Sequence, residues 1–190
     1  KEEKNVDFFV VKGILEGLVF ELGLREHISY QQAQIKGLHP GRTAIVTMDG
    51  NEIGFLGQVH PTLQNELELH ETYVFELSLE NILSAETKAI SYEKLPRYPS
   101  VTRDIALVVN KDTPAGEVKK TVIESGGNLL KDVSIFDVYE GEHLKANKKS
   151  LAFSLLYLDP DRTLTEEEVT EVHNRILDAV RKQFDAELRQ

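Results

Sequence analysis

Residues 133–158 read VSIFDVYEGEHLKANKKSLAFSLLYL, and this stretch decides how the second half of the chain folds. Two runs in it alternate apolar and polar residues, which is the pattern of half-buried β-strands. In the first run, we expect Val133, Ile135 and Phe136 to point to one side, and Asp137 and Tyr139 stand at the far end. The second run, residues 151–158, is apolar on both sides, so we expect this strand to be buried on both faces.

The segment between the two strands is a candidate ligand-binding loop. Residues 140–149 contain Gly141, Asn147 and three lysines, Lys145, Lys148 and Lys149. A long, basic loop that joins two central strands is well placed to hold a ligand, because binding residues concentrate on loops supported by a rigid scaffold.

The elements around this hairpin complete a recognisable order. Residues 103–110 form a strand rich in β-branched residues, and Thr113 with Pro114 is the expected start of a helix that ends at Gly126-Gly127. The inward-facing residues of that helix are predicted to be Val118, Val122 and Ile123.

A second helix is expected to follow the hairpin. Thr165 and Glu168 have the spacing of a capping box. The helix behind them has one apolar face, made by Val169, Val172, Ile176 and Val180. Residues 184–189 form a last strand, so the order is strand, helix, strand, strand, helix, strand. This is the split βαβ arrangement of ferredoxin-like domains, in which two helices cover one face of the sheet.

The first half predicts a helix packed on an antiparallel sheet. Asp7 is the expected N-cap of the helix and Gly23 its end. We expect a turn at residues 38–42. Asp49-Gly50 predicts a hairpin turn between strands 43–48 and 52–59, and His60-Pro61 predicts the start of a short helix. A strand at 73–79 and a helical turn at 79–83 follow. We interpret this half as part of a larger domain, and place the boundary at residues 88–94.

The amino-acid composition limits the functions and locations that fit this chain. The formal net charge of −10 argues against a surface that grips nucleic acid everywhere. Residues 1–90 hold 7 Lys+Arg against 14 Asp+Glu, whereas residues 91–190 hold 15 against 18, so the second half has room for a local basic face. There is no cysteine, no signal peptide is expected, and no apolar run approaches the roughly 18 residues of a membrane span. We therefore expect a cytoplasmic protein without a membrane partner.

Several runs together resemble the C-terminal part of the beta subunit of bacterial phenylalanine–tRNA ligases. In the second half they begin at Tyr98 (YPSVTRDIALVV), Phe136 (FDVY), Lys149 (KSLAF), Arg162 (RTLT) and Ala186 (AELR). In the first half they begin at Asp7 (DFF), Lys12 (KG), Leu38 (LHPGR) and Gly57 (GQVHP). The resemblance covers nearly the whole chain, and the joint order of the runs makes it specific.

The resemblance implies an α+β architecture in two parts. Residues 1–90 would be the C-terminal part of a non-catalytic, class II synthetase-like domain with an antiparallel sheet and helices. Residues 91–190 would be a ferredoxin-fold anticodon-binding domain of βαββαβ order. The family's enzyme is an α2β2 tetramer that uses ATP and magnesium to join phenylalanine to its tRNA. The alpha subunit carries out the chemistry, so this chain would be a non-catalytic fragment without a cofactor of its own.

The resemblance also assigns residues to the tRNA anticodon. Asp137, Tyr139, Ser150 and Ala106 occupy the positions that meet the anticodon bases in the family. Their chemistry suits the task, because a carboxylate accepts two hydrogen bonds from a guanine edge and a tyrosine ring stacks on an unstacked base. The candidate phosphate contacts are Arg97, Arg103, Lys145, Lys148 and Lys149.

Other interpretations stand beside this one. A ferredoxin-like sheet also serves as a protein-interaction or small-ligand regulatory module, and a continuous apolar patch on its open face would favour that alternative. Tyr139 fits a core position equally well, the lysines a solvated loop, and Arg103 a surface pair with Asp104. His39 and His60 precede prolines and read as turn residues rather than metal ligands. His173 is expected at an exposed helix position without a nucleophile partner, so a free-standing enzyme is the weakest interpretation.

Overall fold

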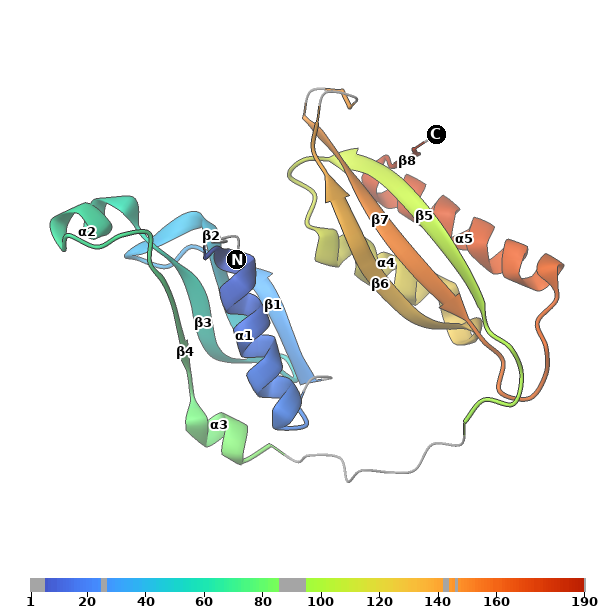
Figure 1. Ribbon diagram of the computed structural model, residues 1–190, viewed down its shortest axis with the longest axis horizontal. Coiled ribbons are helices and arrows are strands. Elements are labelled where there is room, and N and C mark those ends of the chain that lie inside the picture. The colour runs from blue at the N-terminus through green and yellow to red at the C-terminus, as the bar shows by residue number, and fades with distance from the viewer. Residues whose placement is uncertain (1–5, 25–26, 86–94, 142–143, 146, 190) are drawn as a thin grey trace, which may run out of the picture. The chain divides into compact units, whose positions relative to one another are not determined.

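The computed structural model describes residues 6–24, 27–85, 95–141, 144–145 and 147–189 (Figure 1). The chain divides into two compact units, Lys1–Tyr92 and Glu93–Gln190, and each unit has its own hydrophobic core. The boundary predicted at residues 88–94 lies outside the described residues.

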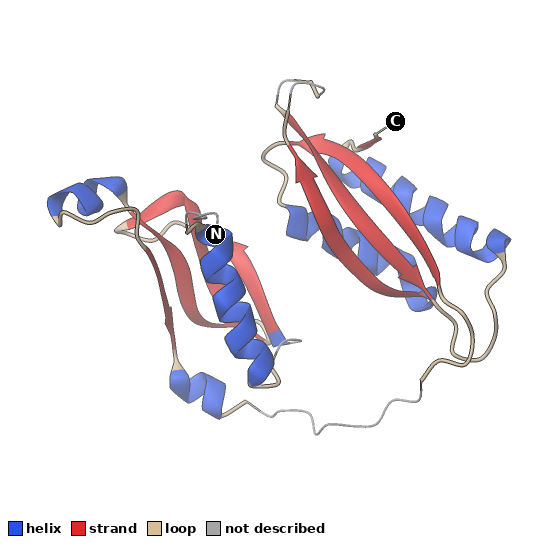
Figure 2. Cartoon of the chain, viewed as in Figure 1, coloured by secondary structure: helices blue, strands red, loops and turns tan. Residues whose placement is uncertain are grey.

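The first unit is a four-stranded antiparallel sheet with one long helix packed against it (Figure 2). The sheet order follows the chain, β1 (Ile28–Gln32), β2 (Leu38–Met48), β3 (Asn51–Val59) and β4 (Tyr73–Leu77). The helices are α1 (Phe8–Glu21), α2 (Pro61–Glu66) and α3 (Leu79–Leu83). Leu15 and Val19 of α1 pack with Val46 and Leu56 of the sheet, so this core forms between one helix face and one sheet face.

Local sequence signals set most of these boundaries. The Asp7 side chain accepts a hydrogen bond from the backbone of Val10 and caps α1, as predicted. The predicted hairpin turn is confirmed, with Asp49 and Gly50 both at positive φ (49° and 83°) between β2 and β3.

The turn predicted at residues 38–42 is wrong. These residues belong to β2, where they form a wide irregularity: Leu38 pairs with Val59, and Thr43 is the next paired residue, opposite Gly57. The chain does bend locally there, because the His39 side chain accepts a hydrogen bond from the Gly41 backbone. Strand pairing therefore continues past a sequence that has the composition of a turn.

The second unit is a four-stranded antiparallel sheet with both of its helices on one face (Figure 1). Its elements are β5 (Val101–Asn110), α4 (Ala115–Gly126), the 3-10 turn η2 (Gly127–Leu129), β6 (Leu130–Tyr139), β7 (Lys148–Tyr157), α5 (Glu166–Phe184) and β8 (Glu187–Leu188). The strand order is β6-β7-β5-β8. Both the element order and the placement of the helices confirm the predicted ferredoxin-like arrangement.

The core of the second unit lies between β7 and the two helices. Leu151, Phe153, Leu155 and Tyr157 point at the helices and are fully buried. The alternate residues of β7 were expected to be buried too, but Ala152, Ser154 and Leu156 are only half-buried. No described helix covers this second face. The partly apolar residues that β7 contributes to it are therefore accessible.

Three further expectations need correction. Thr113 makes no capping hydrogen bond, because α4 begins one residue later and Pro114 takes the N-cap position. Ile123 is 51% exposed, since it follows Val122 and one residue turns the helix by 100° away from the core. The last strand is limited to Glu187–Leu188, because α5 continues to Phe184.

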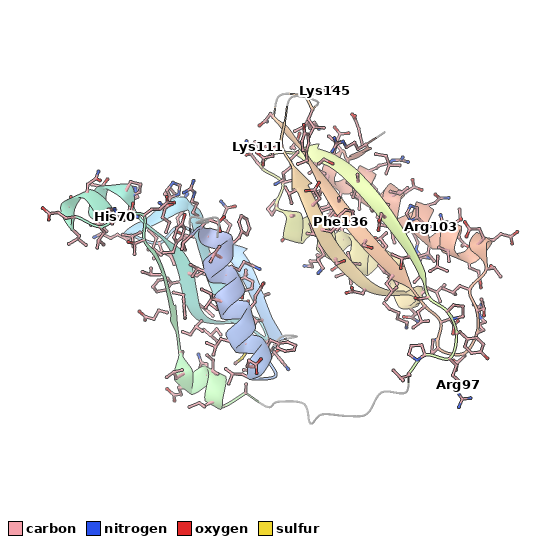
Figure 3. The ribbon with its side chains drawn as sticks, viewed as in Figure 1. His70, Arg97, Arg103, Lys111, Phe136 and Lys145 are labelled. Atoms are coloured by element: carbon pink, nitrogen blue, oxygen red, sulfur yellow. The ribbon has the colours of Figure 1, made fainter. Side chains whose placement is uncertain are left out.

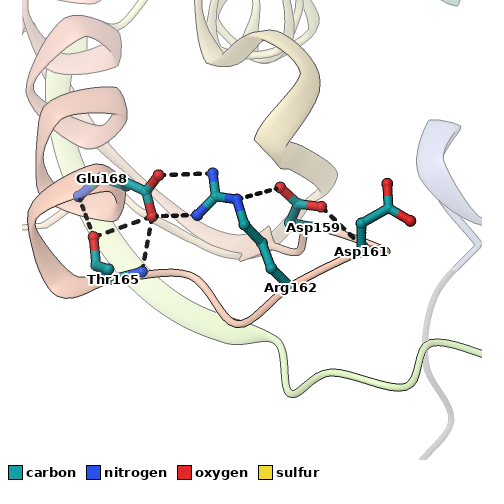
Figure 4. A network of polar contacts seen from close by, with 5 residues as sticks. All are labelled: Asp159, Asp161, Arg162, Thr165 and Glu168. Atoms are coloured by element: carbon teal, nitrogen blue, oxygen red, sulfur yellow. Dashed lines mark hydrogen bonds and ion pairs between the residues drawn. The ribbon is translucent and has the colours of Figure 1, made fainter.

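A polar network fixes the loop that leads from β7 into α5 (Figure 4). The Arg162 guanidinium donates to both carboxylate oxygens of Glu168, at 2.7 and 2.8 Å, and its Nε lies 3.3 Å from Asp159. Glu168 in turn forms the predicted capping box with Thr165. These contacts lower the pKa of Glu168 to about 2, with the Arg162 hydrogen bond as the largest cause. The Arg-Thr-Leu-Thr run thus has a structural role at the start of α5.

Candidate nucleic-acid interface

Strand register brings the predicted anticodon residues together on the open face, the side of the second sheet away from α4 and α5. Tyr139 pairs with Ser150, which pairs on its other side with Val108. In the next row of the face, Asp137 pairs with Ala152, which pairs with Ala106. Directly paired residues lie on the same face of a sheet. The four predicted residues therefore occupy two adjacent rows across β6, β7 and β5.

Asp137 and Ala106 are accessible in these rows. Asp137 is exposed, and Ala106 and Ala152 are half-buried with only methyl groups above the sheet. A flat group placed over the two alanines would meet little obstruction and would lie beside the Asp137 carboxylate. The row therefore combines a hydrogen-bond acceptor with a shallow apolar floor, which suits an unstacked base.

Arg189, which the sequence did not single out, covers part of the neighbouring row. Its backbone N–H donates to the Ala106 carbonyl at 2.9 Å. Its guanidinium carbon lies 4.6 Å from the centre of the Tyr139 ring. Because β7 and β5 separate these two residues in the sheet, their side chains meet above the intervening strands. Ser150, between them, is only 2% exposed.

The Tyr139 ring is thus neither a core residue nor a free surface residue. It is half-buried, with Arg189 over one face and Gly141 beside its hydroxyl end, where a side chain at Gly141 would overlap the ring. Arginine planes and tyrosine rings both stack on bases, so a base can continue the stack that Arg189 and Tyr139 begin. Only the long-range pairing of β8 with β5 reveals it, which explains why local sequence patterns did not.

The lysines gather at the hairpin end of the sheet, where Lys111 joins them (Figure 3). Lys111 lies 2.7 Å from Glu140, and its backbone N–H donates to the Asn147 carbonyl. Lys145 is exposed, and Lys148 and Lys149 are half-buried. Burial lowers the pKa of Lys149, whereas the hydrogen bond to Glu140 raises that of Lys111. This end of the unit carries the local positive charge that the composition allowed.

The two predicted arginines lie elsewhere. Arg97 is exposed, and Figure 3 shows it at the end of the unit opposite Lys145. Arg103 points to the helix side, where it pairs with Glu166 and donates to Thr170 at 3.3 Å. Neither arginine is therefore brought together with the open-face residues.

His173 is packed against the core rather than exposed as predicted. Its Nδ1 lies 3.2 Å from the hydroxyl of Tyr157, a fully buried residue. Burial, followed by the charge of Arg103, lowers the pKa of His173, and burial raises the pKa of Tyr157 to about 12. No serine or lysine completes a nucleophile–base pair with them in the contacts of the described residues. The arrangement is a core hydrogen bond.

Metal-binding and membrane-spanning features bear on the class of site. Among the described residues, no group of three His, Asp or Glu side chains is placed to hold a metal ion. The described helices also include none with the length and apolar character needed to span a membrane. The open face of the second sheet remains the candidate site.

Comparison with known proteins gives matches over both units. Residues 96–189 match the family described as ferredoxin-fold anticodon binding domain. Residues 1–79 match the phenylalanyl tRNA synthetase beta chain CLM domain. The chain is 55% identical over 188 residues to the phenylalanine–tRNA ligase beta subunit of Bacillus cereus strain ZK, 54% identical to that of Bacillus subtilis strain 168 and 57% identical to that of Geobacillus kaustophilus. These alignments cover 99% of this chain and 23% of each relative, so the chain spans about a quarter of their length.

Proposed function

The chain belongs to the family of phenylalanine–tRNA ligase beta subunits, and from this premise we propose that its second unit binds the anticodon of the phenylalanine tRNA during charging. The observation that supports the proposal is the convergence of Asp137, Tyr139, Ser150 and Ala106 on two adjacent rows of one open sheet face. These residues come from three separate strands and were assigned by resemblance, and the strand register of this chain places them together as that assignment requires.

The chemistry of the face divides into base contacts and phosphate contacts. Asp137 accepts hydrogen bonds from the Watson–Crick edge of a purine, Ala106 supports the base plane, and Tyr139 with Arg189 stacks on a neighbouring base. Lys145, Lys148 and Lys111 contact phosphates at the hairpin end, whereas Lys149 pairs with the buried Val109 on the helix side and is left out. We leave Arg103 out of this interface because Glu166 and Thr170 hold it on the other side of the sheet. Arg97 is a candidate for a separate phosphate contact.

The open face favours RNA over the alternative of a protein-interaction module. An apolar docking surface would need a continuous run of exposed hydrophobic side chains. The apolar residues of this face, among them Ala106, Ala152, Leu156 and Phe136, are instead interrupted by polar ones: Thr102, Asp104, Asp132, Ser134, Asp137 and Ser154. Exposed carboxylates on this face suit hydrogen bonds to bases, and the lysines at its hairpin end suit contacts with phosphates.

The first unit would join this domain to the rest of the enzyme. Its α1 is apolar on nearly every side, because Phe9, Ile14, Leu18 and Phe20 are exposed opposite the buried face. A helix that is hydrophobic all round is normally buried in a larger assembly. We propose that other parts of an α2β2 enzyme, including the alpha subunit, cover this surface, and that residues 1–90 and 91–190 act as separate domains. ATP and magnesium would be used at the alpha subunit, in the cytoplasm where charging takes place.

Fluorescence anisotropy tests the proposal directly. The 190-residue chain is titrated at low salt into a labelled phenylalanine anticodon stem-loop and into the same hairpin with a scrambled anticodon. We expect tighter binding to the first hairpin, and we expect Asp137→Ala to remove most of that preference, since a hydrogen bond to a charged group contributes about 1.5–3 kcal/mol. Asp132→Ala is the matched control, because Asp132 lies on the same strand and face, five residues away. Equal binding to both hairpins, or no binding at low salt, would refute base recognition by this chain.

A further inference from the structure

The edge strand β6 has two irregularities in its pairing with β7, one at Lys131 near its start and one at Phe136 in its middle. From Val133 to Ile135 the pairing is regular and ends with Ile135 opposite Phe153. The next pair is Asp137 with Ala152, so Phe136 has no partner and forms a β-bulge. Beyond it the pairing is regular again, through Tyr139 and Ser150.

This bulge is not needed to keep the strand in register. If Phe136 were absent, Ile135 and Asp137 would follow one another opposite Phe153 and Ala152, and every other residue would keep its partner and its face. The extra residue is also not used for packing, because Phe136 is 59% exposed and outside the hydrophobic core. A bulge disturbs the ladder and bends the strand, so one that serves neither register nor core calls for another role.

The bulge places Phe136 beside the Asp137 carboxylate on the open face. Ile135 and Val138 both pair on the helix side, opposite Phe153 and Leu151, so Phe136 and Asp137 between them lie on the open face. In a regular strand, successive side chains point to opposite faces. Only the bulge therefore allows a flat aromatic ring and a carboxylate to be neighbours in sequence and on one face.

We propose that Phe136 is a base-stacking residue of the anticodon interface, and that the bulge exists to set it beside Asp137. The ring contacts the plane of one anticodon base while the carboxylate accepts hydrogen bonds from the edge of that base. Exposed aromatic rings on sheets bind unstacked bases in this way, and stacking tolerates any base because every base has a π-face. This inference rests on the proposed function and adds a residue to it that resemblance did not assign.

Three variants of the 190-residue chain separate the ring from the bulge. Phe136→Ala keeps the bulge and removes the ring, Phe136→Trp keeps an aromatic ring, and deletion of Phe136 removes both. Val138→Ala is the matched control, because Val138 is 52% exposed on the same strand but pairs on the helix side. The exposed position predicts that the point substitutions leave the unfolding midpoint unchanged, so affinity changes report on binding.

The readouts are affinity for the cognate stem-loop and the fluorescence of 2-aminopurine placed at each anticodon position in turn. We expect Phe136→Ala and the deletion to weaken binding by about 5- to 150-fold, the range for loss of one stacked base. Phe136→Trp and Val138→Ala should bind as the unsubstituted chain does. At one anticodon position, quenching of 2-aminopurine on binding should be lost in Phe136→Ala and kept in Phe136→Trp.

The outcomes distinguish this inference from the proposed function. If the unsubstituted chain prefers the cognate hairpin and Asp137→Ala loses that preference, while Phe136→Ala binds within twofold of normal with unchanged quenching, the stacking role is overturned and anticodon binding stands. If the unsubstituted chain shows no preference for the cognate hairpin, the proposed anticodon binding is refuted, and the stacking role of Phe136 is refuted with it. Weakening by Val138→Ala as large as that by Phe136→Ala would assign the effect to the strand rather than the ring.

Discussion

The contact between Arg189 and Tyr139 makes a quantitative prediction. The guanidinium carbon lies 4.6 Å from the ring centre, within the range of a cation–π interaction. Arg189 is exposed and Tyr139 half-buried, so the interaction is partly solvated. Interactions of this kind contribute about 0.5–1 kcal/mol at exposed sites. We therefore expect a coupling free energy in that range between the two side chains, in favour of the folded second unit.

A double-mutant cycle measures this coupling. Arg189→Met keeps the aliphatic stem and the backbone N–H that donates to Ala106, and Tyr139→Leu removes the ring. The two single variants and the double variant are compared by hydrogen exchange at Phe153 and Leu155, whose amides in central β7 report opening of the second unit alone. A coupling of 0.5–1 kcal/mol corresponds to about a two- to fivefold difference in exchange rate. Additive effects within about 0.2 kcal/mol would show that the contact does not hold Tyr139 over the sheet.

Other predictions follow from particular contacts. Gly54→Ala should destabilise the first unit by about 1–3 kcal/mol, because a Cβ there would overlap the Glu76 carbonyl oxygen. We expect faster amide exchange at Leu56 and unchanged exchange at Phe153, and an unchanged exchange rate at Leu56 would contradict the prediction. His173 has a lowered pKa in the folded chain, so the unfolded chain binds a proton first as pH falls below 6.5, and stability should drop from there until the folded pKa is reached. Urea titrations at several pH values measure the free energy of unfolding, and His173→Gln should reduce its dependence on pH. The same pH dependence in both proteins would refute the prediction. Lys148→Ala should reduce the slope of log affinity against log salt concentration for a stem-loop by about 0.7–0.9. Lys182→Ala, on α5, should leave this slope unchanged. Equal slopes for the two variants would show that Lys148 makes no phosphate contact.

Local patterns in the sequence predicted most of the elements. Asp7, Asp49-Gly50 and the Thr165–Glu168 pair each satisfy backbone groups within a few residues of themselves, so their roles can be deduced without knowing the fold. The βαββαβ order followed from these signals and from the alternation in β7. The turn predicted at residues 38–42 failed because β2 already pairs with β3 at Leu38 and resumes pairing at Thr43, so residues 39–42 form an irregularity within a strand.

The site was only partly predictable for the same reason. Asp137, Tyr139, Ser150 and Ala106 came from a family resemblance, while their shared face depends on register between strands. Phe136 was expected on the side of Val133 and Ile135, and this was wrong because a one-residue bulge places it with Asp137 on the open face; strand alternation alone does not reveal such a bulge. Arg189 reaches Tyr139 only through the pairing of β8 with β5, and Arg103 was misplaced because its partner Glu166 lies 63 residues away.

Methyl NMR gives the most direct test that the open face of the second unit holds the anticodon. The 190-residue chain, labelled at alanine, valine and isoleucine methyl groups, is titrated with the unlabelled cognate stem-loop. We expect large shifts for the methyls of Ala106, Ala152 and Val108 on the open face, and none for Ile123, which is exposed on α4. Shifts at Ile123 or in the first unit, with the alanine methyls of the open face unmoved, would contradict this expectation.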